Sequence, residues 1–193
     1  MSEPPRKDGP EHPLFEQAWP EGDYRFFQLG FVVDDIVAAA TRWATVHGVG
    51  PFHITPVVEM QAIVAGSVAP ASIQVGLAQA GPVQIELIQQ HCDRPSVFRE
   101  WATPFHQLAT ITSDVGAKVQ HFRQRGYEVV AEISMTDLQV AYVDTSTDFG
   151  FYTEVVSTNP DFVARWRGIA ETCASWDGTD PVRILTRDGY RVP

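Results

Sequence analysis

The chain repeats itself, and this repeat limits the folds that it can adopt. Residues 26–36 have a counterpart that begins 79 positions later, at residue 105. The identical pairs at this offset are Phe26 and Phe105, Gln28 and Gln107, Leu29 and Leu108, and Asp35 and Asp114. Self-similarity at a fixed spacing indicates one supersecondary unit that is built twice. The chain should therefore fold as two similar halves that bury their apolar faces together.

Each copy begins with a strand pattern and continues with a helix pattern. Asp35 and Asp114 are suitable N-cap residues, and Gly48 suits a helix C-terminus. Behind each cap, apolar residues are spaced i, i+4 and i+7, as on the buried face of a helix: Ile36, Ala40 and Trp43, then Val115, Val119 and Phe122.

Apolar segments of strand length follow each predicted helix. In the first copy they cover residues 52–58, 73–78 and 83–89, with a possible extension over residues 61–66. In the second copy they cover residues 128–133, 140–144 and 151–157. A turn precedes the last strand of each copy, over residues 80–82 in the first and 146–150 in the second. Each copy is thus predicted to be a βαβββ module.

The modules account for most of a chain that we expect to form one compact domain. We assign residues 24–91 to the first module and residues 103–157 to the second. Residues 1–23 are rich in Pro and Glu and are interpreted as an N-terminal arm. Residues 159–193 are interpreted as a helical appendage with a short polar tail, in which Trp166 either packs on the body or meets a second subunit.

Composition excludes several function classes. The formal net charge of −10 opposes binding to nucleic-acid phosphates. The chain has no apolar run of about 18 residues, so no membrane span is expected, and its first residues lack a signal-peptide core. Its two cysteines, Cys92 and Cys173, are too few for a disulfide framework. These features predict a cytoplasmic protein that binds neither nucleic acid nor membrane.

Four short motifs, in order and in duplicate, resemble the vicinal oxygen chelate superfamily, to which glyoxalases, epimerases, extradiol dioxygenases and bleomycin resistance proteins belong. The motifs are Gln28-Leu29-Gly30-Phe31-Val32-Val33-Asp34-Asp35-Ile36, Gln84-Ile85-Glu86-Leu87-Ile88, Phe105-His106-Gln107-Leu108-Ala109 and Tyr152-Thr153-Glu154-Val155-Val156. The resemblance covers residues 24–157. It implies an α+β fold in which two tandem βαβββ modules form a half-open cup of mixed β-sheet.

The same resemblance implies a divalent metal at the base of the cup, held by Gln28, Glu86, Gln107 and Glu154. The superfamily usually has His where this chain has Gln107, and His106 stands one position earlier. Two amides and two carboxylates favour Mg, Mn or Ca, whereas a set with His would suit Co, Ni, Zn or Fe. A metal-free site is left open. Alternate strand residues face opposite sides, so His106 should point away from Gln107 unless a β-bulge intervenes.

The resemblance favours a glyoxalase- or epimerase-like isomerase or lyase that acts on a small molecule with a carbonyl or enol group. Glu154 or Glu86 would move a proton next to the carbonyl, and His106 with the two amides could stabilise an oxyanion. Phe31, Val32, Ile111 and Tyr142 are expected to line the cup. A non-catalytic ligand-binding protein and an extradiol-type dioxygenase remain alternatives, and superfamily members commonly form homodimers. A Glu in an apolar strand could also simply face solvent.

Overall fold

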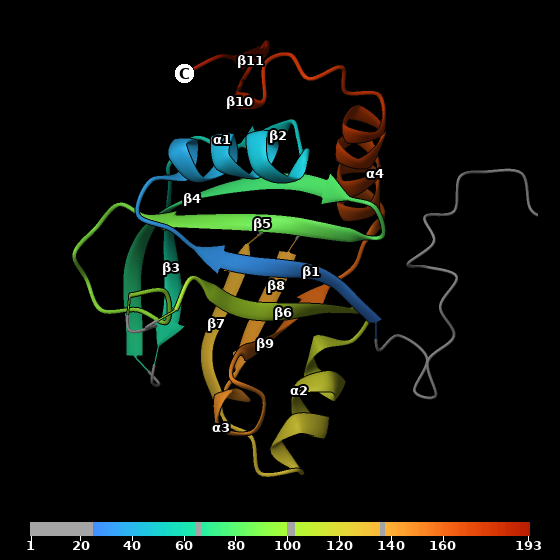
Figure 1. Cartoon of the computed structure of the whole chain (residues 1–193). Helices are drawn as coiled ribbons and strands as arrows, with labels where there is room; N and C mark the ends of the chain where they lie inside the picture. Colours follow the sequence, from blue (N-terminus) through green and yellow to red (C-terminus); the bar gives the residue numbers. More distant parts are fainter. Residues whose placement is uncertain (1–24, 65–66, 100–102, 136–137) are drawn as a thin grey trace, which may run out of the picture.

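Each half of the repeat folds into a strand, a helix and further antiparallel strands (Figure 1). The computed structural model describes residues 25–64, 67–99, 103–135 and 138–193, so the predicted arm over residues 1–23 lies outside the described residues. The first half contains β1 (Arg25–Val32), α1 (Ile36–His47), β2 (Phe52–Ile54), β3 (Val58–Val64), β4 (Ser67–Ala80) and β5 (Val83–Gln90). The second contains β6 (Phe105–Thr112), α2 (Val115–Arg123), β7 (Val129–Met135), β8 (Leu138–Val143), the short α3 (Ser146–Phe149) and β9 (Tyr152–Ser157).

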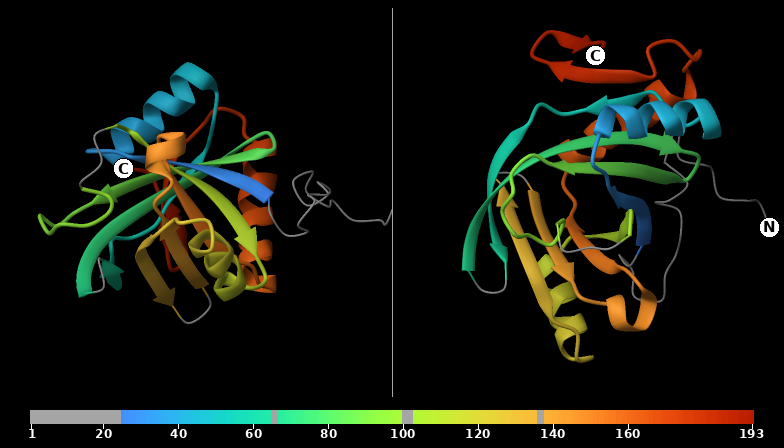
Figure 2. Two further views of the ribbon diagram at one scale, coloured as in Figure 1. Left: turned by 90° about the horizontal axis from the view of Figure 1, so that it is seen from below. Right: turned by 60° about the vertical axis from the view of Figure 1, so that its left-hand side comes forward.

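The two halves join through β1 and β6, which pair antiparallel. Parallel pairs flank this junction, β1 with β5 and β6 with β9, and antiparallel strands continue the sheet on both sides. The sheet curls into a half-open cup whose far strands, β3 and β7, pair over three residue pairs (Figure 2). The predicted α+β fold with two βαβββ modules is therefore confirmed.

Helices α1 and α2 pack against the outside of the cup. The α1 face carries Ile36 and Ala40 and packs on β4 and β5, while the α2 face carries Val119 and Phe122 and packs on β8 and β9. A separate apolar cluster fills the inside of the cup. The sheet therefore has an outer face covered by helices and an inner face on which a site can be built.

The predicted N-caps are confirmed in both halves. The Asp35 carboxylate accepts a hydrogen bond from the Ala38 N–H at 2.9 Å, and the Asp114 carboxylate accepts one from the Ala117 N–H at 2.8 Å. We expect Asp35→Ala to lower the free energy of unfolding by about 1 kcal/mol, because it leaves a helix donor without its side-chain partner. Chemical denaturation measures this loss. Asp34→Ala is the matched control, and an equal loss there would contradict the capping role.

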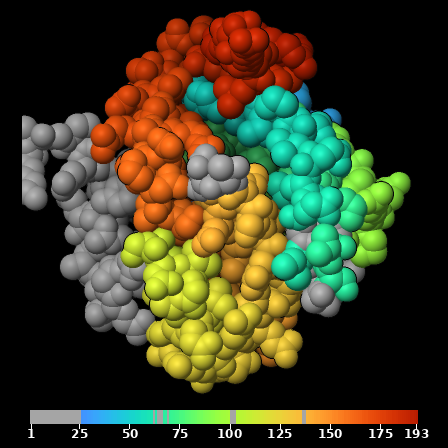
Figure 3. Space-filling view, turned by 180° about the vertical axis from the view of Figure 1, so that it is seen from behind, coloured from blue at the N-terminus to red at the C-terminus, as the bar shows by residue number. Residues whose placement is uncertain are grey.

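The C-terminal segment is more structured than a polar tail. It forms α4 (Pro160–Ala174) and a hairpin of β10 (Val182–Thr186) and β11 (Gly189–Arg191). β10 pairs in parallel with β2, and Val182 is buried in the apolar cluster beneath α1. The predicted polar tail thus forms a hairpin that extends the sheet, and the buried Val182 begins it. Figure 3 shows the hairpin in red next to α4 in orange.

Trp166 of α4 is buried within the chain, with 3% of its surface exposed. Its ring lies 5.0 Å from that of Phe27, and its indole N–H donates to Gln79 Oε1 at 2.7 Å. The interpretation that Trp166 meets a second subunit is therefore wrong, since α4 uses it to close one end of the cup. Within the described residues, no helix is long and apolar enough to cross a membrane.

Candidate functional site

A β-bulge in β6 turns two neighbouring side chains into the cup. Gly30 of β1 lies opposite Gln107, but the next pair along these strands joins Phe31 to Phe105. His106 is therefore the extra residue of the bulge, which breaks the alternation of the strand. Its ring contacts those of Tyr142 and Tyr152, at centroid distances of 5.8 and 5.0 Å. The β-bulge that could bring His106 to the side of Gln107 is therefore present, and the two side chains lie next to each other.

The two predicted glutamates converge on the amide of Gln107. Gln107 Nε2 donates to Glu86 Oε2 at 2.8 Å and to Glu154 Oε2 at 3.4 Å. The Tyr142 hydroxyl donates to the other oxygen of Glu154 at 3.2 Å. Glu86 and Glu154 are only 9% and 5% exposed, so neither faces solvent on the outer side of the sheet. The structure thus brings together three of the four residues that the resemblance implies.

A glycine makes room for this arrangement. A Cβ atom at Gly30 would overlap the carboxamide of Gln107, which lies directly over the Gly30 backbone. A residue without a side chain allows this close approach at the pair where the β-bulge begins. Gly30 is a functional position that the sequence patterns did not single out.

Gln28 stands apart from the carboxylates. It is buried, and its Nε2 donates to Oε1 of Gln84 at 2.7 Å. Gln84 is paired in register with Gln28 on the neighbouring strand, two residues before Glu86. The period-two pattern of β5 could have shown that Gln84 shares the face of Glu86. The fourth residue of the implied metal set is therefore held by a different partner.

His106 is held by contacts at both of its ring nitrogens. Nε2 lies 2.9 Å from the carbonyl oxygen of Val97, and Nδ1 contacts Oε1 of Gln107. Burial lowers the pKa of His106 below its ordinary value and so favours the neutral ring. The contact with Gln107 Oε1 leaves the Gln107 amino group to face the carboxylates. His106 is therefore linked to the carboxylates through Gln107.

The carboxylate pair has an unusual affinity for protons. Burial, together with repulsion from Glu154, raises the pKa of Glu86 well above its ordinary value. Burial raises the pKa of Glu154 to about 7, although hydrogen bonds from Tyr142 and Gln107 oppose the shift. Both carboxyls therefore hold protons more tightly than exposed glutamates, and Glu154 can both gain and lose one near neutral pH.

The donor set fits a hard divalent ion better than a soft one. Glu86 and Glu154 supply carboxylate oxygens in one place, and Gln107 could add an amide oxygen. Both nitrogens of His106 are already in contact with protein oxygens. Across the described residues, no group of three or more His, Cys, Asp and Glu side chains could hold a metal. The imidazole set that suits Zn, Ni, Co or Fe is thus not assembled in this part of the chain.

The lining of the cup differs from expectation at one residue. Tyr142 and Ile111 belong to the inner apolar cluster, and Val32 packs against it. Phe31 instead packs outside, where its ring lies 5.3 Å from that of Trp43 in α1. Phe98, from the segment that links the two halves, covers His106 and Tyr142 from within the cup. No sequence pattern places such a linker residue over a sheet.

Comparison with known proteins agrees with this fold. The family model described as Glyoxalase/Bleomycin resistance protein/Dioxygenase superfamily matches residues 27–142. A hypothetical protein from Bacillus halodurans C-125 is similar in structure, with a TM-score of 0.52, 12% sequence identity, and coverage of 70% of this chain and 95% of that one.

A methylmalonyl-CoA epimerase variant from Streptomyces coelicolor, in complex with 2-nitronate-propionyl-CoA, gives a TM-score of 0.51 at 15% identity. The alignment covers 70% of this chain and 95% of that one. At these identities the likeness concerns the fold. No curated protein matches the sequence.

Proposed function

The chain belongs to the glyoxalase/bleomycin resistance protein/dioxygenase superfamily, and from this premise we propose that it is a glyoxalase- or epimerase-like enzyme. It would move a proton next to the carbonyl group of a small molecule. The observation that carries the proposal is the buried pair Glu86 and Glu154, bound to one amide group inside the cup. Perturbed carboxyls in a cup favour acid–base chemistry over a structural role.

The two carboxyls would take different roles. Glu154 has a pKa of about 7, so at neutral pH a large fraction is ionised and can accept a proton from the carbon next to a carbonyl. Burial and the charge of Glu154 raise the pKa of Glu86 well above its ordinary value, which favours its protonated form and suits it to return a proton. An acid and a base side by side can move a proton from one position of an enolisable substrate to another, or to the other face of one carbon.

The groups around the pair would support this transfer. The Tyr142 hydroxyl and the Gln107 amino group restrain the Glu154 carboxylate, so that it need not reorient when it accepts the proton. The same amino group has two hydrogens, both directed at carboxylates, so it would stabilise negative charge on an enolate oxygen by releasing the longer bond to Glu154 when that carboxylate takes the proton. Apolar neighbours such as Ile111 and Val140 exclude water and keep both carboxyls basic.

A divalent ion could add to this chemistry. Glu86, Glu154 and the Gln107 oxygen are the residues that would hold a hard ion such as Mg or Mn. When bound, such an ion would supply a Lewis acid for the carbonyl oxygen. Gln28 would have to leave Gln84 to contribute.

The location of the glutamates also separates the enzyme from its main rival, a non-catalytic ligand-binding protein. A binding cup needs an apolar lining and polar groups suited to its ligand, but it gains nothing from two buried carboxyls of raised pKa. Both Glu86 and Glu154 lie on the inner face, and this placement supports the catalytic proposal.

Solvent exchange tests the proposal without knowledge of the natural substrate. The protein is incubated in D2O with a panel of small 2-oxo acids and acyl-CoA thioesters, and loss of the proton next to the carbonyl is followed by NMR. We expect exchange above the buffer rate for at least one compound, with a decrease of tenfold or more in both Glu154→Gln and Glu86→Gln.

Glu132→Gln is the matched control. Glu132 is a half-exposed carboxylate that lies 3.6 Å from Arg123, and it has no part in the proposed proton transfer. It should keep the parent rate. Exchange that is equally fast in both site variants, or absent for the whole panel, would overturn the proposal.

A further inference from the structure

A cavity of about 700 Å³ lies at the ends of β1 and β5. Val32 and Gln90, at the last positions of these two strands, line it. Alternate residues of a strand share a face, so Gln90 continues the series that begins with Glu86, roughly 13 Å away along β5. The cavity therefore lies at the edge of the sheet, between the start of α1 and the segment that carries Phe98, and Gln90 and Val32 connect it to the inner face.

Phe98 separates this cavity from the carboxylate pair. It lines the cavity but is only 4% exposed. Its ring lies 5.4 Å from that of His106 and 5.6 Å from that of Tyr142, the residue that donates to Glu154. One aromatic ring thus forms a wall of the cavity and also contacts the residues that hold the site.

The segment that carries Phe98 belongs to no strand, but side chains of the sheet hold it: His106 of β6 contacts the Val97 carbonyl, and Gln90 of β5 accepts from Ser96. The Phe98 N–H donates to the Ser96 hydroxyl at 3.1 Å, and that hydroxyl donates to Gln90 Oε1. The segment can shift without breaking a strand pair, because residues 91–99 belong to no strand. A ligand in the cavity would contact the carboxylates once Phe98 moves away from His106 and Tyr142.

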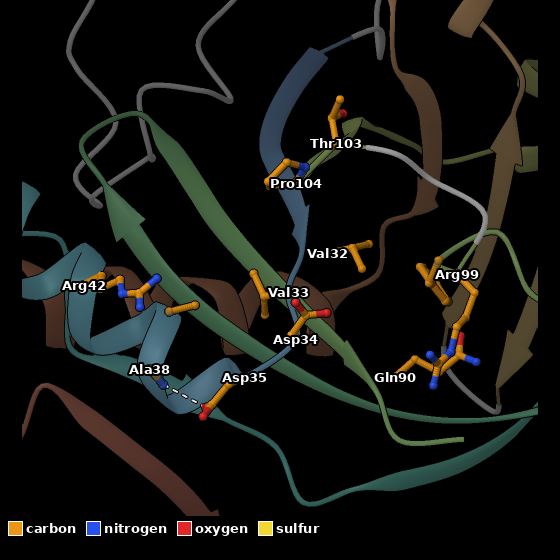
Figure 4. Close-up of a pocket in the computed structure, with 12 residues that line it drawn as sticks. Val32, Val33, Asp34, Asp35, Ala38, Arg42, Gln90, Arg99, Thr103 and Pro104 are labelled. Carbon is orange, nitrogen blue, oxygen red and sulfur yellow. Dashed lines mark hydrogen bonds between the residues drawn. The ribbon is translucent and has the colours of Figure 1, made fainter. Parts of the chain in front are cut away.

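Two arginines face the cavity from opposite sides (Figure 4). The Arg99 guanidinium is positioned by the Cys92 carbonyl at 2.8 Å and by Asp93 at 2.9 Å. Arg42, on α1, forms no hydrogen bond or ion pair through its guanidinium with any residue in the described ranges. Asp34 and Asp35 also line the cavity. The Asp35 carboxylate caps α1, so Asp34 is the lining carboxylate that is not used in the helix cap.

We propose that this cavity binds the substrate of the proton-transfer site, and that Arg42 and Arg99 hold an oxyanion group at the far end of that substrate. The inference rests on the proposed function and adds a substrate class, namely small carbonyl compounds that carry a carboxylate or a phosphate. Guanidinium groups bind both kinds of oxyanion with paired hydrogen bonds. The carbonyl end would contact Phe98 and Val32 and face the carboxylates.

Binding of matched pairs of carbonyl compounds tests this inference. Levulinate and levulinamide differ in a carboxylate, and dihydroxyacetone phosphate and dihydroxyacetone differ in a phosphate. Dissociation constants are measured by NMR titration of the full chain. We expect at least one charged compound to bind fivefold or more tightly than its neutral partner, and the pair with the larger ratio identifies the oxyanion.

The variants locate the effect. In Arg42→Gln and in Arg99→Gln the ratio should fall below twofold, whereas Arg167→Gln, an exposed arginine of α4, should keep it. Resonances of Phe98 and Val32 should shift on binding, and those of Val119, in a smaller cavity beneath α2, should not. Equal binding of charged and neutral compounds, or a ratio that survives both substitutions, would overturn the inference.

This test is separate from the test of the proposed function, because binding needs no turnover. A protein that prefers the charged compounds but exchanges no proton would keep the cavity assignment and lose the catalytic one. A protein that exchanges the proton but binds charged and neutral compounds equally would keep the catalytic proposal and lose the cavity assignment.

Discussion

The free energy of unfolding should fall by roughly 3 kcal/mol between pH 4.5 and about 7 because of Glu154 alone. Burial raises the pKa of this carboxyl from 4.5 to about 7 in the folded chain. A raised pKa means that the folded state binds the proton more tightly than the unfolded state. The stabilisation is therefore complete below pH 4.5 and is lost as the pH rises through about 7.

Glu86 should add to this decline, since its pKa is also raised. His53 and His106 act in the opposite direction, because burial lowers the pKa of each and their contribution is lost as the pH falls below 6.5. The contribution of Glu154 is therefore obtained by subtracting the free energy of unfolding of the parent from that of Glu154→Gln at each pH. Urea denaturation of the parent and of Glu154→Gln at several pH values from 5 to 9 gives the two curves.

Glu154→Gln should become steadily more stable relative to the parent as the pH rises, because an amide has no charge to bury. Glu132→Gln, at a half-exposed position, should follow the parent curve. A constant difference between Glu154→Gln and the parent from pH 5 to 9 would show that Glu154 titrates normally. It would also remove the basis for using Glu154 as a base near neutral pH.

Gly30→Ala should destabilise the protein by about 3 kcal/mol and displace Gln107 from the carboxylates. The new methyl group would occupy the space of the Gln107 carboxamide, which is fully buried and would have to give up its hydrogen bonds to Glu86 and Glu154 to move. Thermal or urea unfolding measures the loss. Gly168→Ala is the control, since Gly168 lies in α4 with open space around it and alanine favours helix there.

A second substitution shows that the cost arises at Gln107. In a Gln107→Ala background, Gly30→Ala should cost far less than in the parent, because the overlapping group is gone. Equal costs in the two backgrounds would mean that the β1 backbone, and not Gln107, rejects the methyl group.

The repeat and its helix caps were enough to predict the two modules, since strand alternation and Asp N-caps depend on local sequence. Glu86 and Glu154 were predicted on the strength of their matched positions, and both lie together inside the cup. Their roles in binding or catalysis stay proposals. The β-strand pattern of residues 182–186 was overlooked because it is short and follows a polar turn.

Features that depend on long-range packing could not be read in advance. The bulge at His106 requires knowledge of which strand pairs with β6 and in which register. The bond between Gln28 and Gln84, and the burial of Trp166, depend on how distant segments meet. Sequence alone could state only the alternatives, which were that His106 faces in or out and that Trp166 packs inside or at a subunit contact.

The plug formed by Trp166 and Phe162 on Phe27 has a consequence for assembly. Helix α4 covers one rim of the cup, so the apolar residues inside that rim are shielded from water by the chain itself and not by a second subunit. That rim is withdrawn from the surfaces through which two copies could associate. Removal of the chain from Pro160 onward would expose the aromatic ring of Phe27, and the truncated protein should then aggregate or self-associate.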